Sequence, residues 1–163
     1  KGANDAAKSR VWAKLSRRLT VESKKANGDA NAANVRSVVE TARTENMPKD
    51  AIERAITKGT AADAASLESV VYECYGPGGA AVIITALTDN TNRTLQALKA
   101  IFAKHDIALA AQGSALWAFD KTAEGYVPKT TIPLSEADNA ALMKVMELID
   151  ELDDVESVFT NAE

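Results

Sequence analysis

Apolar residues recur at helical spacing through the first third of the chain. Val35, Val38 and Val39 stand at positions i, i+3 and i+4, which is the spacing of one helix face. The turn-forming residues 27–29 end the stretch before them, and a third stretch opens at Pro48. We therefore predict a domain of three helices over residues 1–63. The predicted helices are residues 5–26, 31–45 and 48–58.

From about residue 66 the pattern changes to short β-branched and aromatic runs. A turn at residues 76–79 separates an alternating run from a nearly continuous apolar one, as in a strand pair. Pro128 and Pro133 weaken a later strand and favour an edge position. The predicted strands are residues 69–75, 80–87, 114–119, 126–134 and 155–159, and the predicted helices are residues 92–104 and 135–152. This order predicts an α+β fold in which residues 64–163 form an α/β sandwich, with two helices on one face of a mainly antiparallel sheet.

Charge is unevenly distributed between these two parts. Residues 1–58 hold thirteen Lys and Arg against seven Asp and Glu, whereas residues 59–163 hold six against sixteen. The net charge of −4 and the pI of about 5.1 hide this segregation. A segregated cationic surface favours binding to a polyanion. No apolar run approaches the roughly 20 residues of a membrane span, so we expect no membrane partner.

Six basic residues of the first predicted helix fall on one side of it. At about 100° per residue they lie within an arc of roughly 120°, beside an apolar stripe that contains Trp12 and Leu19. The six are Arg10, Lys14, Arg17, Arg18, Lys24 and Lys25. Two interpretations remain open, a nucleic-acid-binding surface and a solvated helix face. Solvated faces usually mix both signs, but Glu22 is the only acid in this stretch, and this favours nucleic acid.

Residues suited to catalysis or metal binding are scarce. His105 is the only histidine and Cys74 the only cysteine, so the sequence offers neither a Cys–His pair nor the usual zinc ligands. Their positions, near a helix end and within a strand, favour structural roles. The carboxylates at residues 150–154 are typical of a solvated helix end. We expect no enzymatic activity, no metal and no cofactor.

Three connecting segments are candidates for contact with a partner. In the corner at residues 46–49, Met47 is either an exposed contact or a hydrophobic staple on the third helix. The segment 76–79 lacks the Gly-Lys-Ser/Thr end of a phosphate loop and is typical of a hairpin turn. Arg93 stands in a first helical turn, where the dipole disfavours a cation, so it pairs either locally or with a partner's phosphate or carboxylate. The candidate contact residues are Asn46, Met47, Pro48, Lys49, Gly76, Pro77, Gly78, Gly79, Asn92 and Arg93.

Two motifs are specific in combination: Tyr-Glu-Cys-Tyr-Gly-Pro-Gly-Gly at residues 72–79 and Asp-Asn-Thr-Asn-Arg-Thr at residues 89–94. With residues 1–15, the Glu-Asn-Met-Pro corner at residues 45–48 and the closing residues 152–161, they extend over nearly the whole chain. In these segments the chain resembles the YebC/PmpR family of probable transcriptional regulators. The mitochondrial translational activator of cytochrome oxidase belongs to the same group.

The resemblance implies a non-enzymatic regulator of gene expression in the cytoplasm, or in the mitochondrial matrix of a eukaryote. Its partner would be nucleic acid, either promoter DNA or the ribosomal RNA of the ribosome. The basic stripe lacks aromatic residues, and no helix-turn-helix stands out, which favours ribosomal RNA. We expect a monomer.

Family members carry a basic segment before the position of Lys1 and an extra α+β domain after about Phe119. We therefore expect that domain to be missing between Lys121 and Thr122, with a break in the chain at that point.

Overall fold

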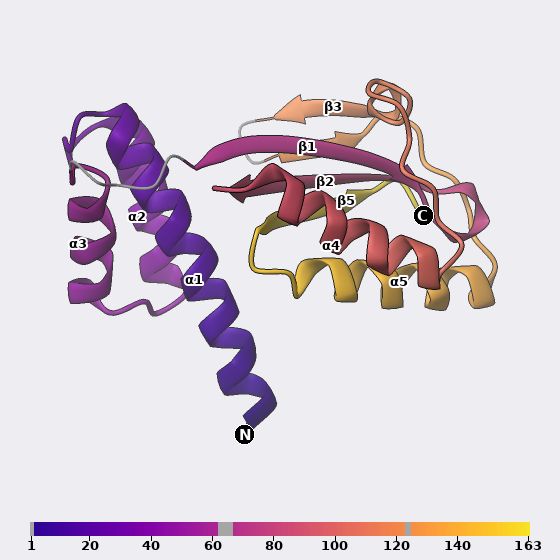
Figure 1. Cartoon of the computed structure of the whole chain (residues 1–163), viewed down its shortest axis with the longest axis horizontal. Coiled ribbons are helices and arrows are strands. Elements are labelled where there is room, and N and C mark those ends of the chain that lie inside the picture. The colour runs from indigo at the N-terminus through magenta and orange to yellow at the C-terminus, as the bar shows by residue number, and fades with distance from the viewer. Residues whose placement is uncertain (1, 62–66, 123–124) are drawn as a thin grey trace. The chain divides into compact units, whose positions relative to one another are not determined.

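The structure is a computed structural model that describes residues 2–61, 67–122 and 125–163, with the side chains of the first helix described from residue 7. The chain divides into two compact units, residues 1–67 and 68–163 (Figure 1). The predicted boundary after residue 63 lies outside the described residues. The predicted fold class, a three-helix domain followed by an antiparallel α+β domain, is confirmed.

Three helices make up the first unit: α1 (Gly2–Lys25), α2 (Ala33–Thr44) and α3 (Lys49–Lys58). The turn after α1 places Asn27 and Gly28 at φ values of 53° and 84°, which Asn and Gly tolerate better than other residues. The three helices enclose one core of apolar side chains. Its buried members are Leu19, Val38, Ala42, Met47, Ile52 and Ala55.

Helices α1 and α3 approach closely through small and polar residues that the apolar pattern did not identify. The Thr20 hydroxyl donates to the Ala55 carbonyl at 2.9 Å, and the Ser23 hydroxyl donates to the Ile56 carbonyl at 2.6 Å. Gly59 fits against them, because a Cβ atom there would lie 2.6 Å from the Thr20 carbonyl oxygen. Both hydroxyl residues are buried, and their hydrogen bonds satisfy groups that would otherwise be costly to bury.

The second unit is built on an antiparallel sheet in the order β1 (Glu68–Tyr75), β2 (Ala81–Thr88) and β5 (Val155–Thr160). Helices α4 (Thr91–Lys104) and α5 (Glu136–Asp150) lie on one side of it, and the hairpin of β3 (Phe119–Thr122) and β4 (Gly125–Pro128) lies on the other (Figure 1).

Strand β2 is buried on both faces, which explains why residues 80–87 form a nearly continuous apolar run. Val82 and Ile84 belong to the core shared with the helices, whereas Ala81 and Ile83 pack with Phe119 below the hairpin. Since successive side chains of a strand point to opposite faces, most positions of such a strand are apolar, and the hydroxyls of Thr85 and Thr88 in β2 are hydrogen-bonded.

Two predicted strands are wrong in their extent. Residues 114–119 were predicted as a strand, but residues 116–118 form the 3-10 turn η2 (Leu116–Ala118) and β3 begins only at Phe119. The backbone N–H groups of Ala115 and Leu116 donate to the Glu73 carboxylate instead of a strand partner. The predicted strand 126–134 ends at Pro128, because the N–H groups of Lys129 and Thr130 both turn to the Ala118 carbonyl.

The position of the predicted chain break, between Lys121 and Thr122, lies within β3. Strand β3 runs through both residues, and each pairs with β4, Lys121 with Tyr126 and Thr122 with Gly125. Residues 123–124, which connect the two strands, lie outside the described residues. The local sequence is therefore compatible with a hairpin at the place where the resemblance implies another domain.

Candidate nucleic-acid interface

The basic stripe of α1 points away from the core of the helical unit. On an angular scale of about 100° per residue with Arg10 at zero, the buried Leu19, Thr20 and Ser23 lie at roughly 180°, 280° and 220°. The middle of the stripe lies near roughly 20° on the same scale, on the opposite side of the helix. The buried face is thus rotated further from the stripe than apolar residues alone predicted, and the apolar Val11, at roughly 100° on this scale, is 38% exposed.

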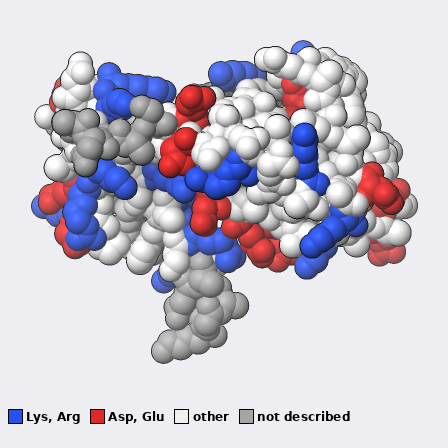
Figure 2. Space-filling view, viewed as in Figure 1, with Lys and Arg blue, Asp and Glu red and all other residues white. Residues whose placement is uncertain are grey.

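The stripe residues differ in exposure. Lys24 and Lys25 are exposed, whereas Arg10, Lys14, Arg17 and Arg18 are half-buried. Lys14, Arg17 and Arg18 also interact with other groups of the chain. The one acid of this stretch, Glu22, is held by the Asn34 amide at 2.7 Å and by Lys25 at 3.4 Å. The helical unit carries many other Lys and Arg side chains on its surface (Figure 2).

Met47 belongs to the core of the helical unit, and the half-buried Trp12 packs against it. The Trp12 indole N–H donates to the Glu45 carbonyl at 2.9 Å, which ties α1 to the corner between α2 and α3. Met47 is 5% exposed. Its prediction as an exposed contact is therefore wrong, because its side chain fills the space between the helices as a staple would. Asn46, Pro48 and Lys49 around it are exposed, and Asn46 takes a left-handed φ of 60°.

The predicted glycine segment forms the turn between β1 and β2, with the short 3-10 turn η1 (Pro77–Gly79) inside it. Gly78 has a φ of 76°, and a Cβ atom there would lie 2.5 Å from the Leu134 side chain. A Cβ atom at Gly76 would lie 2.7 Å from Leu142. Both glycines pack closely against α5 and the residues before it, and the left-handed φ of Gly78 favours glycine there, which gives the segment a structural role.

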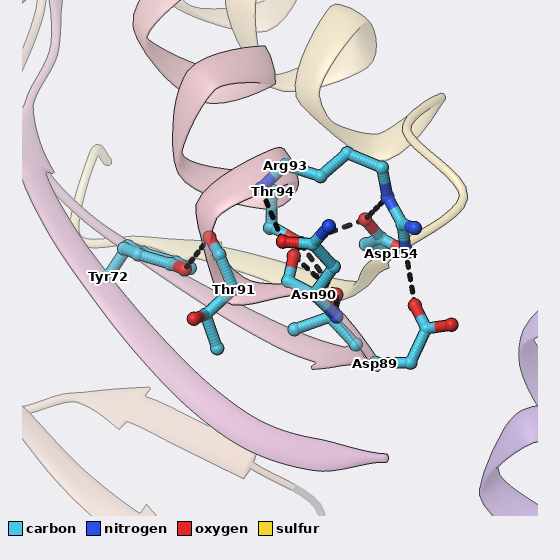
Figure 3. Close-up of polar contacts among 8 residues, drawn as sticks. Tyr72, Asp89, Asn90, Thr91, Arg93, Thr94 and Asp154 are labelled. Carbon is cyan, nitrogen blue, oxygen red and sulfur yellow. Dashed lines mark hydrogen bonds and ion pairs between the residues drawn. The ribbon is translucent and has the colours of Figure 1, made fainter. Parts of the chain in front are cut away.

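Of the two interpretations left open for Arg93, the structure shows the local one, in which it pairs with carboxylates of its own chain. Its guanidinium donates to Asp154 at 2.9 and 3.2 Å and to Asp89 at 2.7 Å (Figure 3). Asp89 stands four residues before Arg93, and Asp154 follows α5, so the arginine joins the start of α4 to the start of β5. These contacts raise the pKa of Arg93 and lower the pKa of Asp89.

The rest of the motif at residues 89–94 completes this network (Figure 3). The Asn90 side chain caps α4 by accepting from the Arg93 N–H at 3.0 Å. The Thr94 hydroxyl lies 2.8 Å from Asp154 and 2.9 Å from the Thr88 hydroxyl. Asp154 is thus supplied with donors although it is buried. Asn92 is exposed on the first turn of α4.

Glu73 is the residue of the first motif that sequence reasoning missed. Its side chain is 3% exposed, and its carboxylate accepts hydrogen bonds from the backbone N–H groups of Gly113, Ala115 and Leu116 at 2.6, 2.8 and 2.9 Å. A lone acid at an inward position of a strand, with no basic residue near it in sequence, was the available signal. The carboxylate fixes the loop that carries the exposed Trp117.

The described residues offer little for other chemistry. Among them, no three His, Cys, Asp or Glu side chains are placed to hold a metal ion together. Burial raises the pKa of the Cys74 thiol to about 12, so the thiol stays protonated at neutral pH. Within the described part of the chain, no helix has the length and apolar character needed to span a membrane.

Two protein-domain families match most of the chain. Residues 1–62 match the TACO1/YebC protein N-terminal domain, and residues 67–124 match the TACO1/YebC second and third domain. The second match ends at the β3–β4 connection, where the resemblance places an extra domain.

Proteins named probable transcriptional regulatory protein are similar over most of the chain. The protein from Lactiplantibacillus plantarum is 41% identical over 90% of this chain and 60% of its own length. The protein from Desulfosudis oleivorans is 39% identical over 100% of this chain and 67% of its own length. The chain thus spans about 60 to 67% of the length of these relatives.

A solved structure shares the fold. The crystal structure of a conserved hypothetical protein from Aquifex aeolicus superposes with a TM-score of 0.87 at 25% sequence identity. The superposition covers 98% of this chain and 91% of the other.

Proposed function

The chain belongs to the TACO1/YebC family, and on that premise we propose that it is a nucleic-acid-binding regulator of gene expression that binds through the basic stripe of α1. The single observation that carries the proposal is the direction of the stripe. Six basic residues face away from the core of the helical unit, and the one acid in the sequence of residues 10–25, Glu22, is already held by Asn34 and Lys25. Lysine and arginine in such an array bind the phosphates of nucleic acid.

Within this function we propose ribosomal RNA as the working target. Trp12, the one aromatic residue in the sequence of α1, packs half-buried against the core and its indole N–H is held by the Glu45 carbonyl, so it is already engaged within the helical unit and does not stand out as a platform for stacked bases. A stripe of cations without base-reading side chains suits recognition of backbone and shape, which is how structured RNA is mostly bound. The proposal is for a ribosome-associated translation factor without catalytic activity.

The second candidate function is transcriptional regulation through promoter DNA. The names of the relatives from Lactiplantibacillus plantarum and Desulfosudis oleivorans favour it. The stripe serves this function equally well, because phosphate contacts carry no sequence information. The two candidate functions predict different results when a DNA duplex competes with ribosomes for the protein.

Sedimentation with ribosomes separates the candidates. We expect the protein to sediment with ribosomes and to remain bound when a promoter-sized DNA duplex is added at modest excess over the ribosomes. Release by the duplex would favour promoter DNA instead. If the protein neither sediments with ribosomes nor binds the duplex, the proposed function is wrong.

A further inference from the structure

Strand β1 is an edge strand whose outer side is covered only in part. The sheet order β1-β2-β5 leaves one side of β1 without a neighbouring strand. At its C-terminal end, Ala110 donates to the Glu73 carbonyl at 2.8 Å, and Leu109 forms a bridge with Cys74. Among the described residues, no segment pairs with the outer side of residues 69–72. A free edge of this kind is a template for another extended chain.

The direction of the backbone groups on this edge follows from the hydrogen bonds at its C-terminal end. Gly76 donates to Ala80 across the turn, whereas the Glu73 carbonyl accepts from Ala110 on the opposite side. Because the backbone groups of successive residues alternate in direction along an antiparallel strand, those of Val71 and Ser69 point away from β2. The outer edge thus presents a donor and an acceptor at each of these two residues.

A groove of about 470 Å³ runs along this edge. Strand β1 supplies one wall, and the segment around Leu109 and Gln112 supplies another. Val71 is 38% exposed and Leu109 is 39% exposed, which is unusual for large apolar side chains in the same groove. The site therefore combines unpaired backbone groups with apolar surface, the two features that recognise an extended peptide by strand addition.

We propose that this edge binds an extended, lysine- or arginine-bearing segment of a partner protein, which adds to the sheet as a strand antiparallel or parallel to β1. Charge selects this occupant. Residues 59–163 hold sixteen acidic against six basic residues, and Glu68 is exposed at the start of β1. A second copy of this chain would bring two acidic units and two Glu68 side chains together, whereas a basic segment complements them.

This inference goes beyond the proposed function, because it concerns a protein partner of the second unit and not the nucleic acid bound by α1. Either can fail without the other. Backbone hydrogen bonds supply the affinity in strand addition, and alternate side chains supply specificity. Suitable partner segments have small or β-branched residues at alternate positions, where they meet Val71 on its face of the sheet.

Amide hydrogen exchange followed by NMR tests the proposal on the whole chain. The probe is a synthetic peptide of three Thr-Val repeats with two lysines at each end. We expect the peptide to slow exchange of the Ser69 and Val71 amides, and to leave the Val70 and Tyr72 amides unchanged because they already face β2. Unchanged Ser69 and Val71 amides at saturating peptide would overturn the proposal. Protection without peptide would also overturn it, as would protection that rises with protein concentration, since the chain itself would then cover the edge.

Matched variants sharpen the test. Val71→Pro removes the outward N–H and fixes φ at about −65°, and should weaken peptide binding at least about fivefold, the effect of one net hydrogen bond, whereas Val71→Thr keeps the N–H and a β-branched side chain and should bind normally. A peptide N-methylated at the amides that face β1 should bind the unaltered protein more weakly by the same reasoning, which keeps the test independent of how Val71→Pro folds. Glu68→Lys should reduce the preference for lysine-flanked over glutamate-flanked peptide. Equal binding of the methylated and unmethylated peptides would overturn strand addition.

Discussion

Two buried carboxylates hold the loops of the second unit in place, each by accepting from a different kind of donor. Asp154 accepts from the Arg93 guanidinium and the Thr94 hydroxyl, so its charge is balanced by a cation. Glu73 accepts from three backbone N–H groups, so its charge is balanced by peptide dipoles. Each carboxylate therefore stabilises a segment distant from it in the sequence, and this contact explains why an acid stands at that position.

Glu73→Gln should destabilise the second unit. The amide keeps one acceptor oxygen but places an NH₂ group against a backbone N–H, so one buried donor loses its partner. We expect the free energy of unfolding to fall by about 1 to 3 kcal/mol. Urea unfolding measures this loss, and Glu68→Gln on the exposed start of the same strand is the control. Equal stability of the two variants would contradict the role of Glu73 as the anchor of the loop.

Met47→Ala should reduce stability and leave nucleic-acid binding unchanged per folded molecule. The side chain is buried in the core of the helical unit, and removal of a buried Met side chain costs about 2 to 5 kcal/mol. Thermal unfolding and a binding titration on the folded fraction measure the two effects. The exposed neighbour Lys49→Ala should keep normal stability. A binding defect in folded Met47→Ala protein would restore the contact role.

Periodicity located the core at the residue scale but not the polar groups that fit into it. Leu19, Val38 and Ile52 follow from spacing, because apolar side chains on one helix face must find a core. Thr20, Ser23 and Glu73 are buried because particular backbone groups lie opposite them. Those partners are distant in sequence, and hydropathy does not encode them.

At the scale of elements, local stop and start signals fixed the helices well. Ser135 caps α5 at the predicted start of that helix, with its hydroxyl accepting from the Asp138 N–H at 3.1 Å, and Asn90 caps α4. The strands β3 and β4 were harder to place, because the Glu73 carboxylate and the Ala118 carbonyl divert the backbone N–H groups around them. A strand extends only where a neighbouring backbone is available, and this depends on tertiary contacts.

The contact between α1 and α3 depends on the missing side chain of Gly59. Its φ of −66° suits any residue, so Gly59→Ala tests the contact without backbone strain. A methyl group would meet the Thr20 carbonyl and the Ser23 side chain, and such overpacking costs about 1 to 3 kcal/mol. Guanidinium unfolding measures the loss, with the exposed Lys58→Ala as control. A gain in stability, as at an unhindered glycine, would show that the helices are not held so closely.

At the scale of the whole molecule, the net negative charge conceals a separation of basic and acidic residues between the two parts of the chain. A net charge of −4 disfavours contact with nucleic acid, but the basic excess lies in residues 1–58 and the acidic excess in the rest of the chain. Each unit encloses a core of its own, so surface charge on one unit can be altered without entering the core of the other. The salt dependence of binding then reports which basic residues bind phosphate.

Replacement of Arg10, Lys14, Arg17 and Arg18 together by Gln should weaken nucleic-acid binding and flatten its dependence on salt. The slope of log K against log salt should fall by about 0.7 to 0.9 for each phosphate that the variant no longer neutralises, because fewer counterions are released. The matched control replaces four basic residues of the second unit, Lys99, Lys104, Lys121 and Lys144, by Gln and changes the net charge equally. Titrations at several salt concentrations measure both slopes, and thermal unfolding shows whether each variant is folded. If the slope of log K against log salt falls equally in both variants, net charge governs binding and the stripe is not the interface. If the slope is unchanged in the variant without the four stripe residues, the stripe does not bind phosphate at all.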